Sequence, residues 1–201
     1  MEILLGLLTL ITCSLATPWV LVKKIKWETS HIVIEGKRQA FNGTATELFG
    51  LWVKWLLLSV VTCGFYMYYA HIDYMKWVVS HTSYAGRELP TGMRYKDSTF
   101  DGTFAGYLGT AILSSLLTAI TCGFGYPWAY TKLHKWDIDN QTIGGDRYVY
   151  DGTGGGLFGV YIVNALLTTI TCGIYLPWAE CALNRYLISH THIVRVNGWQ
   201  R

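Results

Sequence analysis

A basic residue followed directly by an aromatic one occurs four times along the chain, always at the same distance from a Thr-Cys pair. The bases are Lys26, Lys76, Lys135 and Arg185, and the aromatic residues that follow them are Trp27, Trp77, Trp136 and Tyr186. Four such cations held together could bind the phosphates of lipid headgroups or line a path for anions. The simpler interpretation is that each base reaches the edge of a membrane beside an interfacial ring.

Polar residues that interrupt the repeated pattern are a second group of candidates, because the architecture does not require them. His71 and Glu180 occupy the same position in two copies of the repeat, Asp73 lies close to His71, and Asn164 sits in an apolar stretch. Ionisable groups inside a membrane are functional candidates by default. A partner within the same bundle, for instance Lys76 for Asp73, explains them at least equally well.

Histidine and cysteine also recur at fixed positions and could form a metal site or carry protons. The histidine position holds His31, His81, Asn140 and His190, and the Thr-Cys pairs supply Cys13, Cys63, Cys122 and Cys172. The asparagine excludes a site of four equivalent histidines, whereas both residue types can cap the end of a helix. Small apolar residues at tight helix ends explain the cysteines. The sequence therefore predicts no catalytic residue, metal or cofactor, and we do not expect an enzyme.

The elements that must position these residues belong to a tandem repeat of about 50 residues. In each copy a Gly-Thr pair precedes an apolar helix that runs to the Thr-Cys pair; a Gly-containing turn, a second helix and a β-hairpin follow. Thr44 and Glu47 have the spacing of a capping box at one helix start. The copies cover approximately residues 1–40, 41–99, 100–149 and 150–201, and the first copy is truncated.

Composition and charge distribution point to a membrane protein. Charged residues make up 14% of the chain, against about 25% in soluble domains, and the first helices are apolar for about 16 to 19 residues, near the length that spans a bilayer. The apolar stretch from Ile3 to Ala16 is expected to be a retained helix. Membrane-embedded hairpins would put 15 of the 16 Lys and Arg residues on one side. Because cytoplasmic segments are enriched in Lys and Arg, this distribution favours hairpins over alternating single crossings.

The predicted fold is therefore an all-α membrane protein with small β-hairpins, in one membrane domain over residues 1–201. It would consist of four tandem helical-hairpin repeats, with about eight membrane-embedded helices and the β-hairpin links on one side. Whether the second helix of each repeat spans fully is left open.

Several motifs together resemble those of a known family. They are Phe41-Asn42-Gly43-Thr44, Tyr150-Asp151-Gly152-Thr153 with Leu157-Phe158-Gly159, Tyr175-Leu176-Pro177-Trp178-Ala179, and Ser189-His190-Thr191. Nearly the whole chain is similar to the YjgN-like family of bacterial inner-membrane proteins, which carry a domain of unknown function. The resemblance implies a location in the bacterial inner (cytoplasmic) membrane and supplies no established activity. The second copy departs from the pattern, with Tyr68-Tyr69 in place of Pro-Trp.

The functional expectation is a multi-pass inner-membrane protein with both termini cytoplasmic, acting as a non-enzymatic scaffold or accessory subunit. Lipid binding is one option for that role, and the alternative is a small-solute transporter or channel. The expected partners are membrane lipids, with a larger membrane complex or a homo-oligomer as further options. A dispersed net charge of +3 argues against nucleic acid.

Overall fold

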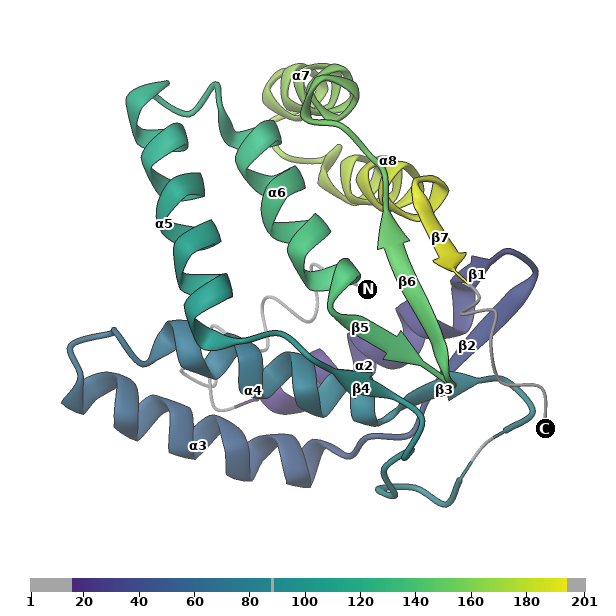
Figure 1. Ribbon diagram of the computed structural model, residues 1–201. Helices are drawn as coiled ribbons and strands as arrows, with labels where there is room; N and C mark the ends of the chain where they lie inside the picture. The colour runs from purple at the N-terminus through teal and green to yellow at the C-terminus, as the bar shows by residue number, and fades with distance from the viewer. Residues whose placement is uncertain (1–15, 88, 195–201) are drawn as a thin grey trace. The chain divides into compact units, whose positions relative to one another are not determined.

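The computed structural model describes residues 16–87 and 89–194, and the chain divides into two compact units (Figure 1). The first unit comprises Met1–Phe100 and Thr142–Gly145, and the second comprises Asp101–Gln141 and Asp146–Arg201. Both units are built from helical hairpins and short antiparallel strands.

The first unit contains three described helices and a three-stranded sheet. Its elements are α2 (Thr17–His31), β1 (Val33–Ile34), β2 (Lys37–Phe41), α3 (Ala45–Val61), α4 (Met67–Ser80), β3 (Thr82–Tyr84) and β4 (Thr99–Phe100). The sheet has the order β1-β2-β3. Strand β2 pairs antiparallel with both neighbours, with Val33 opposite Arg38 and Phe41 opposite Thr82.

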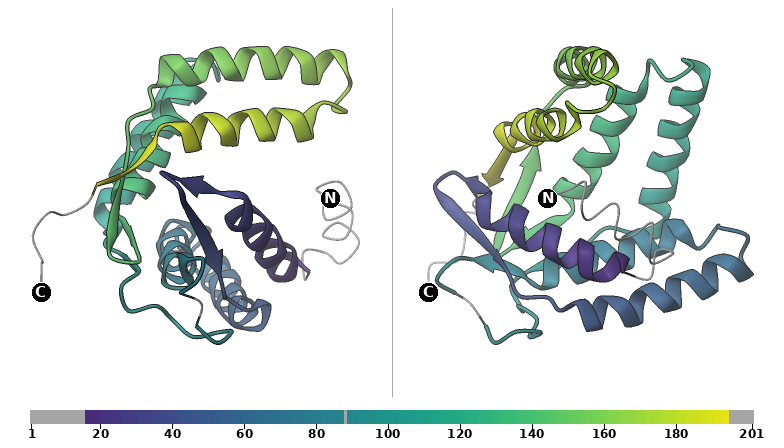
Figure 2. Two further views of the ribbon diagram at one scale, coloured as in Figure 1. Left: turned by 90° about the vertical axis from the view of Figure 1, so that its right-hand side faces the viewer. Right: turned by 180° about the vertical axis from the view of Figure 1, so that it is seen from behind.

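The second unit contains two complete helical hairpins. Its elements are α5 (Phe104–Ile120), α6 (Tyr126–Asp139), β5 (Gln141–Ile143), β6 (Asp146–Tyr150), α7 (Gly154–Ile170), α8 (Leu176–Ser189) and β7 (Thr191–Val194). Residues 142–143 of β5 fall within the first unit. Strands β6 and β7 pair antiparallel, with Tyr148 opposite Ile193. Within this unit the α7–α8 hairpin crosses the α5–α6 hairpin steeply (Figures 1 and 2).

The three described helical hairpins have identical boundaries in the frame of the repeat. Counted from the threonine of the Thr-Cys pair, which is Thr62, Thr121 or Thr171, the first helix ends one residue earlier. The second helix begins five residues later in all three copies. Residues at equal offsets from this repeat threonine therefore occupy equivalent structural positions.

A threonine caps the start of each first helix. The hydroxyl oxygens of Thr44, Thr103 and Thr153 accept hydrogen bonds from the backbone N–H three residues later, which satisfies a donor that the helix leaves unpaired. The Glu47 carboxylate in turn accepts a hydrogen bond from the backbone N–H of Thr44. This pair forms the capping box that the sequence predicts.

The Thr-Cys-Gly segment stops each first helix. Cys63, Cys122 and Cys172 have φ values of 49°, 49° and 50°, and the glycine after each also has a positive φ. The N–H of Gly64 donates to the carbonyl of Ser59, and that of Cys63 donates to Val60. These are the two bonds of a Schellman motif, with a cysteine in the left-handed position where glycine is usual. The turn ends each helix at a fixed length.

Hydrophobic packing joins helices of neighbouring copies of the repeat. In the first unit, Val22 and Ile25 of α2, Leu48 of α3 and Trp77 of α4 form one buried cluster. In the second unit, α6 packs against α7, and the contacts include the first turn of α6: the ring of Trp128 lies 5.3 Å from that of Phe158, and the ring of Tyr126 lies 5.5 Å from that of Tyr161. Even so, Val61, Ile120 and Ile170 beside the Thr-Cys turns are largely exposed.

The prediction of about eight membrane-embedded helices is wrong. Among the residues that the structure describes there are seven helices, and none combines the length and apolar character needed to cross a membrane. The longest have 17 residues, or about 25 Å at 1.5 Å per residue, against a hydrocarbon core of about 30 Å. The apolar run continues into the turn, but the helix stops at the left-handed cysteine. The predicted helix from Ile3 to Ala16 lies outside the described residues except for Ala16, which precedes α2.

The arrangement of the hairpins also differs from the prediction. The expected β-hairpin links on one side require parallel hairpins, whereas α5–α6 and α7–α8 cross steeply within the second unit (Figure 2). The strands form two antiparallel sheets, with orders β1-β2-β3 and β4-β5-β6-β7. An all-α description therefore misses strand pairing between neighbouring copies.

Candidate membrane-contact surface

The four predicted bases lie at equivalent and exposed positions on the second helices of the repeat. Lys26 lies on α2, Lys76 on α4, Lys135 on α6 and Arg185 on α8. Lys135 is partly engaged, because its Nζ donates to the carbonyl of Tyr150 at 2.6 Å and lies 3.1 Å from the Asp139 carboxylate. A role of the four bases in binding lipid or anions stays a prediction.

The aromatic residues that follow three of these bases pack inward, on the start of the first helix in the same copy. Trp77 is buried, and the Tyr186 hydroxyl donates to the carbonyl of Thr153 at 3.0 Å. Trp136 lies so close to Gly106 that a Cβ there would come within 3.2 Å of the indole nitrogen. These rings hold the two helices of a hairpin together. In the first copy, Trp27 is exposed.

The histidine position caps the second helix, as predicted. Nδ1 of His31, His81 and His190 donates to the carbonyl four residues earlier, at 2.7 to 2.9 Å. In the third copy, Nδ2 of Asn140 donates to the carbonyl of Trp136 at 2.7 Å. One bond with the same geometry thus explains why both residue types occur there.

Two of the four interrupting polar residues have defined partners. Asp73 accepts a hydrogen bond from Nζ of Lys54 at 2.9 Å and one from the Trp55 indole at 3.4 Å, so its partner is Lys54 and not Lys76. This hydrogen bond to the Asp73 carboxylate raises the pKa of the Lys54 ammonium. Asn164 donates to the carbonyl of Val160 within its own helix.

His71 and Glu180 are half-buried on α4 and α8. Each takes part in an interaction within the structure. A functional role for either residue stays a prediction.

Each hairpin exposes the same four apolar positions around its turn, and we refer to these twelve residues as the hairpin ends. They are Leu57, Val61, Phe65 and Met67; Leu116, Ile120, Phe124 and Tyr126; and Leu166, Ile170, Ile174 and Leu176. Val61, Ile120 and Ile170 are 78%, 72% and 69% exposed. Exposed apolar residues that recur in contiguous groups indicate a contact surface, in contrast to scattered single ones.

The sequence contains a signal for the hairpin ends that the prediction of spanning helices obscured. No Asp, Glu, Lys or Arg occurs between Lys54 and Asp73, between Asp101 and Lys132, or between Asp151 and Glu180. Each charge-free stretch covers the turn and both flanking helix halves. Tyrosine and tryptophan, such as Tyr126 and Trp128, lie within it near the start of the second helix.

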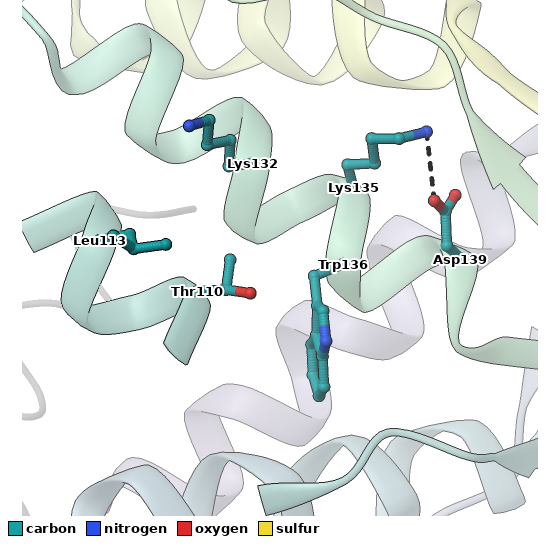
Figure 3. Close-up of a pocket in the computed structure, with 6 residues that line it drawn as sticks. All are labelled: Thr110, Leu113, Lys132, Lys135, Trp136 and Asp139. Carbon is teal, nitrogen blue, oxygen red and sulfur yellow. Dashed lines mark ion pairs between the residues drawn. The ribbon is translucent and has the colours of Figure 1, made fainter. Parts of the chain in front are cut away.

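A pocket lies between the helices of the α5–α6 hairpin (Figure 3). Its volume is about 320 Å³, and its lining residues are Thr110, Leu113, Lys132, Lys135, Trp136 and Asp139. Lys135 turns towards Asp139, whereas Lys132 extends in another direction (Figure 3). Lys132 is exposed and has no hydrogen bond or ion pair within the described residues.

These features define a class of protein built from repeated helical hairpins that are capped alike at the strand end and apolar at the turn end. The chain belongs to a family of bacterial proteins of unknown function, DUF898, whose model matches residues 36–90 and 145–197. The resemblance to the YjgN-like family is thereby confirmed. No curated protein and no solved structure matches the chain.

The two family matches agree with the repeat. Both begin 26 residues before a repeat threonine, at residue 36 before Thr62 and at residue 145 before Thr171. Each covers one helical hairpin with its flanking strands. The α5–α6 hairpin and its pocket lie between the two matched spans.

Proposed function

We propose that the protein is a non-enzymatic scaffold that docks on the bacterial inner membrane by inserting its hairpin ends into the lipid, without crossing the bilayer. The observation that carries this proposal is the threefold recurrence of exposed apolar side chains at equivalent positions. Packing between copies uses the strand end of the hairpins in the first unit, and Tyr126 and Trp128 against α7 in the second. It does not account for Val61, Ile120 and Ile170.

The distribution of residue types along each hairpin supports a lipid surface as the occupant. Moving away from the turn, the apolar ends give way to an aromatic residue, such as Trp128 or Trp178, and then to bases such as Lys132 and Lys135. Apolar residues suit the acyl region, Trp and Tyr suit the interface, and Lys suits the headgroups. A protein partner would not impose this order in every copy.

The energy of insertion favours the use of several hairpin ends together. Burying one large apolar side chain contributes about 1.5–3 kcal/mol, so four partly inserted residues supply several kcal/mol for one end. A single acyl anchor of similar strength holds a protein only reversibly.

Two further observations support a scaffold over an enzyme. The recurrent histidines donate to helix carbonyls, and the Asp73 carboxylate binds Lys54, so these groups have structural uses. The sequence alternative, a small-solute transporter or channel, gains no specific support from the described residues. Cytoplasmic placement of both termini and membership of a larger complex or homo-oligomer stay predictions.

Vesicle flotation with a triple variant tests the proposal. Val61→Ser, Ile120→Ser and Ile170→Ser together remove one exposed residue from each hairpin end and should weaken partitioning into lipid vesicles by at least about ten-fold. Because these side chains are mostly exposed, the circular dichroism spectrum should not change. The matched control carries Val33→Ser, Met93→Ser and Val194→Ser, which are exposed apolar residues outside the hairpin ends.

Two results would contradict membrane docking. The first is equal flotation of the triple variant, the control and the wild type. The second is wild-type protein that forms a stable oligomer without lipid and does not float, while the triple variant is a monomer in light scattering. That result would assign the hairpin ends to self-association.

A further inference from the structure

We propose that the pocket between α5 and α6 binds the headgroup of a monoanionic phospholipid, with Lys132 as its principal contact. The inference rests on the proposed membrane docking and adds a lipid class and a location to it. Three observations lead to it: the charge of the pocket, its continuity with a hairpin end, and the residues at the same positions in the other hairpins.

The charge of the pocket matches an anion that carries one negative charge. Lys132 and Lys135 contribute two positive charges, and Asp139 contributes one negative charge. Asp139 pairs with Lys135 at 3.1 Å, so the charge available to a ligand is that of Lys132. Lys135 has three N–H donors, and its bonds to Asp139 and Tyr150 leave one for a phosphate oxygen.

The apolar wall of the pocket continues to the hairpin end. Leu113, which lines the pocket, is 62% exposed, and Leu116 and Ile120 follow it on α5 at helical spacing, both exposed. They form an apolar path from the cations to the turn. A pocket of about 320 Å³ is large enough for a phosphodiester headgroup, and an acyl chain would follow the path. A free phosphate would leave this path unused.

The equivalent positions in the other two hairpins do not offer this combination. In α3–α4 the residues matching Leu113 and Lys132 are Lys54 and Asp73, which form an ion pair at 2.9 Å. In α7–α8 the matching residues are Val163 and Ala182, so both are apolar. Among the three described hairpins, α5–α6 is therefore the one that combines an apolar residue at the first of these positions with a lysine at the second.

The test measures binding of soluble, short-chain lipids by calorimetry, so that it does not depend on vesicle docking. Wild-type protein should bind dihexanoyl phosphatidylglycerol at least five-fold more tightly than dihexanoyl phosphatidylcholine. Lys132→Gln should abolish that preference, a change of about five-fold that corresponds to about 1 kcal/mol per base. Lys132 is exposed, so the variant should fold. The matched control is Lys23→Gln, which changes an exposed lysine at the same offset in the first copy.

The apolar path is tested with the headgroup alone and with one further variant. Deacylated glycerophosphoglycerol should bind at least ten-fold more weakly than the lipid, and Leu113→Ser should weaken lipid binding while leaving headgroup binding unchanged. Equal binding of headgroup and lipid would replace the lipid site with a phosphodiester site. Equal binding of the two lipids, or an unchanged preference in Lys132→Gln, would overturn the inference.

Flotation separates this inference from membrane docking. Protein that floats with vesicles but shows no preference for phosphatidylglycerol would refute the pocket as a lipid site and leave docking intact. Protein that binds the short-chain anionic lipid but does not float would refute docking.

Discussion

The α3–α4 and α5–α6 hairpins have the same lengths, caps and turns, but different residues between their helices. In α5–α6 the interface is made by small buried residues, with Ala111 and Ser114 on α5 facing Ala129 on α6, and the Ser114 hydroxyl donates to the carbonyl of Ala129 at 3.3 Å. The positions of Ala111 and Ser114 hold Trp52 and Trp55 in α3. Accordingly α5 and α6 pack closely along their length, whereas α3 and α4 approach each other at few points.

This difference shows that the repeat specifies the ends of a hairpin and leaves its interior free to vary. The capping threonine, the left-handed cysteine and the helix-end His or Asn act on backbone groups, so they work whatever lies between the helices. The interior then decides whether a hairpin is bridged by an ion pair, as with Lys54 and Asp73, or keeps a pocket with an uncompensated lysine. A single scaffold can therefore carry different ligand sites in different copies.

The largest expected effect comes from exchanging the interiors. Ser114→Trp puts the α3 residue into the close α5–α6 interface, where Ser114 is 2% exposed, and overpacking of this kind should destabilise the protein by about 3 kcal/mol. Urea unfolding followed by circular dichroism measures the change. Ser115→Trp is the control, because the neighbouring Ser115 is exposed and should change stability by less than about 0.5 kcal/mol. Equal effects at the two positions would refute the close interface.

A smaller effect is expected at the turns, and it should be the same in both hairpins. Cys63→Gly and Cys122→Gly should each stabilise the protein by about 1 kcal/mol, because glycine adopts a positive φ without steric cost. Cys→Ala at either position should be nearly neutral, since the side chain is exposed and alanine meets the same steric restriction. Thermal unfolding of the four variants tests this, and destabilisation by glycine would contradict the left-handed turn.

The Lys54–Asp73 ion pair of α3–α4 should contribute little to the free energy of unfolding, but it should prevent Lys54 from binding anionic lipid. Asp73→Asn removes the charge that binds Lys54; because the two side chains are 21% and 47% exposed, solvent screening limits the loss to about 0.5–1 kcal/mol. The freed Lys54 should give this hairpin some affinity for anionic lipid. Calorimetry with dihexanoyl phosphatidylglycerol would show a second, weaker binding event, whereas an unchanged isotherm would mean that an unpaired lysine alone does not create a site.

The smallest effect concerns acid sensitivity of the second unit. Burial lowers the pKa of His134 below its usual value, against the opposing influence of Asp137; the equivalent residue in α4 is Met75. The folded state therefore binds this proton less readily than the unfolded state. The contribution of neutral His134 to the free energy of unfolding is fully present above about pH 6.5 and is lost as the pH falls through the lowered pKa. His134→Met should flatten the stability profile below about pH 6.5, and a steeper profile in the variant would contradict this sign.

The sequence predicts the local features of this fold correctly, whereas the prediction of about eight membrane-embedded helices is wrong. Caps and breaks depend on a few residues close in sequence, so Thr44 with Glu47 and the His or Asn position could be identified directly. The Thr-Cys pair is likewise predicted as the end of each first helix, and the expected apolar length of about 16 to 19 residues agrees with the 17-residue helices that form. The error therefore concerns the spanning of a membrane and not the helix boundaries.

The candidate sites also divide into those that the sequence identifies directly and those that depend on how the helices pack. Bases at fixed offsets were evident, but the pairing of Asp73 with Lys54 joins residues 19 positions apart on two helices and follows from the geometry of the hairpin. The pocket beside Lys132 is lined by residues of both α5 and α6, so it exists only once these two helices are packed. The hairpin ends were visible as charge-free stretches, but were assigned to spanning helices.

The central claim is that the hairpin ends enter the acyl region of a bilayer, and a depth measurement at Cys122 tests it most directly. An environment-sensitive fluorophore is attached to Cys122 in protein whose other cysteines are replaced by alanine, and vesicles are prepared with bromine on the acyl chains. The account predicts a blue shift and strong quenching at Cys122, and neither change for a fluorophore at Arg147→Cys, which lies on β6 at the strand end of the unit. Emission at Cys122 that is unchanged by vesicles, or quenching that is equal at the two positions, would contradict it.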